Sequence, residues 1–183
     1  ILPTMPASKC PAIRQANYRA ATGYYEQALD RGFRSAALFN NLGYCYDKVN
    51  DLGNAERCLR QALAADPKLP VAVYNLARLN LRQAVDKGVI PDTGIIEKAI
   101  SLGTESVELD IDAARIFAVA AGSELSLTGR QKQLERCLLF CARAARLGSN
   151  RGQLRVVANF YKPLQDDPRF RELLQSATEI KTT

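Results

Sequence analysis

The sequence of 183 residues contains no histidine. Histidine is the commonest general base and the commonest metal ligand in proteins. A catalytic site or a metal site in this chain would therefore have to be built from other residues. The phosphate-binding patterns G-x-x-x-x-G-K-[ST] and G-x-G-x-x-G are missing, as is the nucleophile pattern G-x-S-x-G. These absences remove the most frequent routes to catalysis. We therefore expect a chain that is not an enzyme and that uses no cofactor.

Long apolar runs are also missing. No segment approaches the roughly 18 consecutive apolar residues that a membrane-spanning helix needs. The opening segment, residues 1–6, lacks the basic stretch followed by an apolar one that marks a signal peptide. Residues 1–10 are expected to be a linker or a frayed terminus. Because the chain begins with Ile1, we expect it to be a fragment or a processed product of a longer parent.

Cysteine is present in an odd number and without a C-x-x-C pair. The five residues are Cys10, Cys45, Cys58, Cys137 and Cys141, scattered through helix-like sequence. This pattern argues against a disulfide framework and against a zinc site, which would need further ligands. The last four lie among apolar residues and are expected to be small buried side chains. A reducing compartment, the cytoplasm, follows from this interpretation.

The strongest positive signal is a pattern of small and apolar residues between Ala36 and Leu69. Its members are Phe39, Leu42, Gly43, Tyr46, Ala55, Leu59, Ala62, Leu63, Asp66 and Pro67. Small residues at Gly43 and Ala55 would let two antiparallel helices approach closely. Asp51 suits the N-cap of the second helix, and Pro67 would end that helix.

The pattern recurs at a spacing of 34 residues. Upstream it is matched by Ala21, Tyr25, Ala28 and Leu29, and downstream by Asn75, Leu76 and Ala77. The second helix of the downstream repeat is displaced by an insertion near residues 86–92, and we expect it to contain Ala99, Val107 and Asp110. A fourth, degraded repeat contains Phe117, Ala120 and Ala121. A fixed period of this length is typical of helical repeat arrays.

These residues resemble the tetratricopeptide-repeat family. The resemblance implies an all-α fold, a right-handed superhelical solenoid of helix-turn-helix hairpins. We expect the array over residues 11–149, with about 3.5 repeats, and a pair of capping helices with a tail over residues 150–183.

Helices are expected near residues 11–31, 35–49, 52–65, 69–86, 93–109, 112–127, 130–147, 150–161 and 167–177. Thr128 and Gln131 are expected to form a capping box at the start of the seventh helix. Asp167 and Pro168 form a helix-start signal for the last one.

The resemblance also implies a concave groove, lined by the first helix of each hairpin, that binds an extended peptide or a helix of another protein. The candidate groove residues are Asn40, Asn41, Tyr44, Lys48, Tyr74, Asn75, Arg78, Arg82 and Arg115. Asn41 and Asn75 are equivalent in successive repeats, and an amide can pair with peptide backbone as donor and acceptor. The cationic residues suit an acidic segment. The alternative is that all of these are solvated polar residues on helix surfaces.

Two other functions stay open. Residues 164–174 weakly resemble the ends of repeat arrays attached to bacterial serine/threonine protein kinases, which implies a regulatory arm of a larger signalling enzyme, although no kinase motif is present. Lys132, Arg136 and Arg143 share one expected helix face, and a basic stripe of this kind is also found in nucleic-acid-binding arrays. This stripe lacks interleaved aromatic residues, so an acidic protein partner is favoured over nucleic acid.

Overall fold

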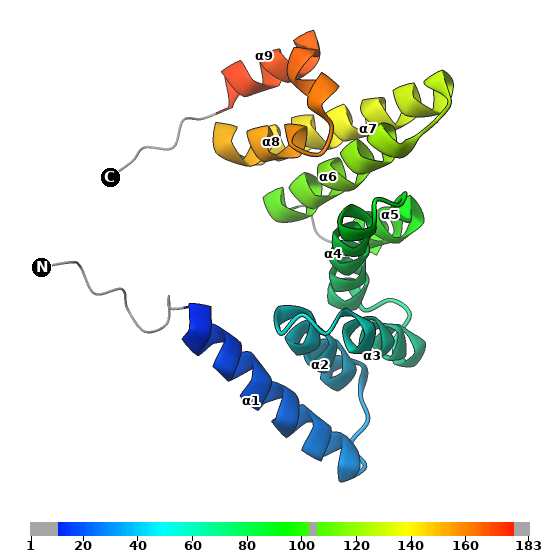
Figure 1. Ribbon diagram of the computed structural model, residues 1–183, viewed down its shortest axis with the longest axis vertical. Helices are drawn as coiled ribbons and strands as arrows, with labels where there is room; N and C mark the ends of the chain where they lie inside the picture. The colour runs from blue at the N-terminus through cyan, green and yellow to red at the C-terminus, as the bar shows by residue number, and fades with distance from the viewer. Residues whose placement is uncertain (1–10, 103–105, 178–183) are drawn as a thin grey trace, which may run out of the picture. The chain divides into compact units, whose positions relative to one another are not determined.

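The computed structural model describes residues 11–102 and 106–177, and the regular structure in these ranges is entirely helical (Figure 1). The expected frayed end, residues 1–10, lies outside the described residues, as do residues 103–105 and 178–183. The described helices are α1 (Pro11–Asp30), α2 (Ala36–Lys48), α3 (Leu52–Ala65), α4 (Pro70–Lys87), α5 (Thr93–Leu102), α6 (Val107–Ser123), α7 (Leu127–Arg146), α8 (Arg151–Ala158), the 3₁₀-helix η2 (Lys162–Asp166) and α9 (Pro168–Ser176). The all-α prediction is confirmed, with successive helices packed as hairpins.

The chain divides into two compact units, and the boundary falls inside α4, between Leu79 and Asn80. In the first unit, α2 and α3 form an antiparallel hairpin and α1 packs on α2. A Cβ atom at Gly43 would lie 2.9 Å from Leu59 Cγ and 3.1 Å from the carbonyl oxygen of Ala55. The two helices therefore touch where the sequence supplies a glycine and an alanine, as expected from the repeat pattern.

The ends of this hairpin follow from local capping. Ser35 Oγ accepts a hydrogen bond from the backbone N–H of Leu38 at 3.1 Å, which starts α2. Asp51 accepts one from the N–H of Asn54 at 3.2 Å and starts α3, so its predicted role as N-cap is confirmed. The last helical residue of α3 is Ala65, two positions before Pro67.

The second unit is built around the hairpin of α6 and α7, which carries α8 on α6 and α9 on α7. The rings of Phe117 and Phe140 stack between the hairpin helices with centroids 5.5 Å apart. Asp167 caps α9 and Pro168 occupies its first turn, as the sequence predicted. The guanidinium of Arg169 and backbone N–H groups hold the pKa of Asp167 below its usual value.

A buried ion pair joins the two long helices of this unit. The Asp110 side chain is fully buried in α6, and its Oδ2 atom lies 3.3 Å from Nε of Arg143 on α7. The guanidinium of Arg143 also lies over the ring of Phe140, 5.3 Å from its centroid. Arg143 therefore compensates a carboxylate that would otherwise be costly to bury.

Two expected helix boundaries are wrong. The fifth helix ends at Leu102 instead of residue 109, and Val107 and Asp110 belong to α6. The cause is Ser106, whose Oγ accepts from the N–H of Leu109 at 3.0 Å and starts a new helix there. Acidic residues in the first turn of α6 also favour a helix start at this point.

The expected capping box at Thr128 is wrong as well. Ser126 caps α7, and its Oγ accepts from the N–H of Gly129 at 3.0 Å. Helix α8 ends at Ala158, earlier than expected, and Lys162–Asp166 form η2, which contains Pro163.

The cysteines in the described ranges are free and buried, as expected. They are Cys45, Cys58, Cys137 and Cys141. Burial raises the pKa of the Cys45 and Cys58 thiols. Cys45 and Cys58 are therefore protonated packing residues at neutral pH.

Our first prediction tests the close contact of α2 and α3. Gly43→Ala should lower the free energy of unfolding by about 1–3 kcal/mol, because the new methyl group meets Leu59 and the Ala55 carbonyl. The matched control is Gly53→Ala on α3, where a Cβ atom meets nothing within 4 Å. The control should be neutral or stabilising by up to about 1 kcal/mol. Urea unfolding measures both; equal stability of the two variants would refute the close contact.

A second prediction concerns the two arginines of α7. Arg143→Met removes the guanidinium that faces the buried Asp110 and should destabilise by about 3 kcal/mol. Arg136→Met removes the ion pair with Glu97, whose side chain is 40% exposed, and should cost less than about 1 kcal/mol. Thermal unfolding of both variants checks this order, and a reversed order would contradict the burial of the Asp110 pair.

Candidate functional site

A chain of three asparagine side chains connects α2 with α4 in the first unit. The Nδ2 group of Asn75 donates to Oδ1 of Asn40 at 3.0 Å. The Nδ2 group of Asn40 in turn donates to Oδ1 of Asn41 at 3.2 Å. Thus two helices that start successive repeats in the sequence pattern are joined through their side-chain amides.

The three amides differ in exposure, and this decides what each can do. Asn40 is only 5% exposed, so it differs from the surface groove residue that the sequence suggested. Its amide instead fixes the orientation of its two neighbours. Asn41 is exposed, and no described residue accepts a hydrogen bond from its Nδ2 group. Asn41 therefore presents an oriented donor at the surface of α2.

Next to these amides lies a cluster of tyrosines. The ring of Tyr44 on α2 meets the ring of Tyr18 on α1 edge to face, with centroids 6.0 Å apart. Lys48 Nζ lies over the Tyr44 ring, 4.8 Å from its centroid, and 3.5 Å from Oδ2 of Asp47. The hydrogen bond with Tyr44 raises the pKa of Tyr18. Tyr44 and Lys48 are thus held in place by contacts from two helices.

On α4 the same pairing of aromatic ring and cation recurs. The guanidinium carbon of Arg78 lies 5.7 Å from the centroid of the Tyr74 ring. Arg78 is exposed, whereas Tyr74 and Asn75 are half-buried. The first unit therefore brings together seven of the nine candidate residues on α2 and α4. We refer to this set as the amide face: Asn40, Asn41, Tyr44, Lys48, Tyr74, Asn75 and Arg78.

The other two candidates belong to the second unit. Arg82 follows Arg78 by one helical turn on α4, beyond the boundary at Leu79. Arg115 on α6 forms an ion pair with Asp112, Nη1 to Oδ1 at 2.8 Å, and lies over the ring of Phe160. The guanidinium of Arg115, one of the candidate groove residues, is therefore engaged within its own unit.

The expected exposed basic stripe on α7 is only partly correct. Lys132 is exposed. Arg136 pairs with Glu97 and lies 5.0 Å from the centroid of the Phe117 ring, and Arg143 is 20% exposed and faces Asp110. A stripe whose arginines are neutralised by carboxylates offers little to a phosphate backbone.

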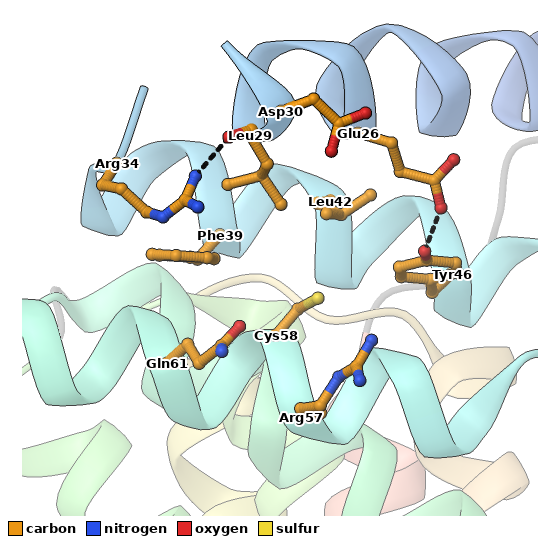
Figure 2. Close-up of a pocket in the computed structure, with 10 residues that line it drawn as sticks. All are labelled: Glu26, Leu29, Asp30, Arg34, Phe39, Leu42, Tyr46, Arg57, Cys58 and Gln61. Atoms are coloured by element: carbon orange, nitrogen blue, oxygen red, sulfur yellow. Dashed lines mark hydrogen bonds between the residues drawn. The ribbon is translucent and has the colours of Figure 1, made fainter. Parts of the chain in front are cut away.

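A hollow in the first unit lies between α1, α2 and α3, with a volume of about 260 Å³. Figure 2 shows its apolar floor, formed by Leu29, Phe39 and Leu42, and the hydrogen bond from the Tyr46 hydroxyl to Glu26. Burial and this carboxylate raise the pKa of Tyr46. The hollow is rimmed by charges of both signs, so it shows no preference for one class of ligand.

Tyr18 is the residue of the site that sequence reasoning missed. It precedes the segment of α1 that matches the repeat pattern, and no motif marks it. The only sequence feature that points to Tyr18 is its position one turn before Thr22. In the structure Thr22 is buried, and its hydroxyl donates to the Tyr18 carbonyl at 2.9 Å.

Other classes of site find no support in the described ranges. No group of three or more acidic or cysteine side chains there could hold a metal ion. Among the helices of residues 11–102 and 106–177, none is long and apolar enough to cross a membrane.

Comparison with known proteins does not identify a family for this arrangement. Neither the known family models nor the curated proteins give a match to the chain.

Proposed function

We propose that the chain is a non-catalytic helical scaffold of the tetratricopeptide type, a superhelical array whose amide face binds an extended segment of another protein. The observation that carries this proposal is the hydrogen bond from Asn75 to Asn40. It joins α2 and α4, the two helices that carry the equivalent asparagines of the 34-residue sequence pattern. Stacking of this kind turns equivalent residues of neighbouring repeats into one continuous surface.

The chemistry of the amide face suits peptide backbone. An extended segment carries unpaired N–H and C=O groups, and these need partners when a protein surface removes them from water. Asn41 supplies a donor and Asn75 a half-buried amide, and Asn40 holds both of them. Because amides offer donors and acceptors alike, the face would bind backbone with little dependence on side-chain sequence.

Charge at the amide face favours an acidic segment. Lys48 and Arg78 each lie over a tyrosine ring on the helices that carry the asparagines, and Lys48 also lies 3.5 Å from Asp47. The net charge of the whole chain is +6, which would accelerate the approach of a negatively charged partner. Nucleic acid fits less well, because the arginines of α7 described above face carboxylates.

The test separates backbone recognition from folding. A library of unstructured peptides, half of them acidic, is screened against the whole chain, and the tightest peptide is measured by titration calorimetry. Asn41→Ala should lower its affinity by about 1–2 kcal/mol and should lower the melting temperature less than Asn40→Ala does, because the lost side chain is exposed although its oxygen accepts from the buried Asn40 amide. Asn40→Ala should lower both affinity and melting temperature, because it leaves the Asn75 donor without its buried acceptor.

The matched control is Gln61→Ala, which removes an exposed amide from α3 and should bind like the parent chain. If Asn41→Ala together with Asn75→Ala binds the peptide as tightly as the parent, the amide face is not the site. A second arm replaces Lys48 and Arg78 by glutamine. This change should slow association with the acidic peptide and flatten its dependence on salt.

A further inference from the structure

Among the described residues of the first unit, helix α1 is packed on one side only. Its inner face holds the buried Thr22 and the Tyr18 ring against α2. All residues from Pro11 to Asn17 are exposed, and Tyr24, in the middle of the outer face, is 71% exposed. Figure 1 shows the N-terminal half of α1 (dark blue) lying apart from the α2–α3 hairpin. We call the exposed side the outer face of α1: Ile13, Ala16, Ala20, Tyr24 and Gln27, which repeat at helical spacing.

The charges beside this outer face are separated along the helix. Arg19 lies in the N-terminal half, and Glu26 and Asp30 follow two and three turns later along the same edge. Arg19 and Asp30 have no ion-pair partner among the described residues. Glu26 binds the Tyr46 hydroxyl through one carboxylate oxygen, Oε1. One end of the edge is therefore basic and the other acidic.

We propose that two copies of this chain associate through the outer faces of their α1 helices, packed antiparallel about a two-fold axis between Thr22 and Gly23. Arg19 and Glu26 are equally far from this point, so each Arg19 would meet Glu26 of the second copy, with Asp30 one turn away. In the same register Tyr24 of each copy is level with Ala21 of the other, one residue from Ala20 on the outer face. A large ring then faces a small side chain, twice.

Charge complementarity selects a second copy over other occupants. An antiparallel copy brings the basic end of the edge to the acidic end of the other copy, whereas in a parallel pair the two charged edges lie on opposite sides of the interface and stay unpaired. An anionic membrane would attract Arg19 but repel Glu26 and Asp30. The arrangement is isologous, so one helix supplies both halves of the interface.

Analytical ultracentrifugation of the whole chain tests this proposal. We expect a reversible dimer. Its dissociation constant should rise about tenfold or more in Ala20→Gln, because the larger side chain occupies the space of the Tyr24 ring. Arg19→Glu should have a similar effect, because it places a second negative charge beside Glu26. Two matched controls should dimerise like the parent. Ala64→Gln makes the same change on an exposed site of α3, and Arg14→Glu makes the same charge reversal on a different side of α1.

The geometry is tested by cross-linking across the axis. With Cys10 replaced by serine in every variant, Gly23→Cys should form a disulfide-linked dimer under mild oxidation, and Gly53→Cys on α3 should not. Both sites have open space for a side chain, so neither variant should unfold. A monomeric parent chain, a dimer insensitive to Ala20→Gln and Arg19→Glu, or equal cross-linking of the two cysteine variants would each overturn the proposal.

Discussion

The close approach of paired helices is the constraint on which the rest of the structure depends. At Gly43 the backbone of α2 comes so near to α3 that even a methyl group would collide with it. The hairpin of α6 and α7 obeys the same constraint, because Ala114, Ala118 and Ala144 are completely buried there. Small side chains at these points let large ones such as Leu59 and Phe117 fill the remaining space. Both units therefore gain their core from the same alternation of small and large residues.

Polar groups buried near these cores restrict how the helices can align. The amide of Asn40 and the carboxylate of Asp110 are each buried, and each faces a group on another helix. Sliding either helix by one turn would separate the pair and leave a polar group in an apolar environment, which is costly. These contacts add less to the net stability than apolar packing does, but they make one alignment far better than its neighbours.

Much of the fold could be predicted from the sequence, because apolar spacing and capping residues act locally. The helices around Gly43 and the cap at Asp51 are examples, and so is the start of α9 at Asp167. The prediction failed at residues 106–109, where the repeat period was extended across Ser106 although its hydroxyl starts a new helix. The candidate site was predicted less well. A period of 34 residues aligned Asn41 with Asn75, but the burial of Asn40 depends on the side chains around it. The contacts of Arg115 and Arg143 likewise depend on how separate helices pack.

Because each unit contains buried thiols, the reactivity of these thiols can report how often that unit opens locally. A thiol reagent reacts only with an accessible thiolate, and Cys45 and Cys58 are at most 5% exposed, while Cys137 and Cys141 are fully buried. Labelling at these positions must wait until the surrounding helices separate. Once Cys10 is replaced, the first pair records the opening of the α2–α3 hairpin and the second pair records that of α7. The rates of local opening in the two units can then be measured in one experiment, without adding a probe.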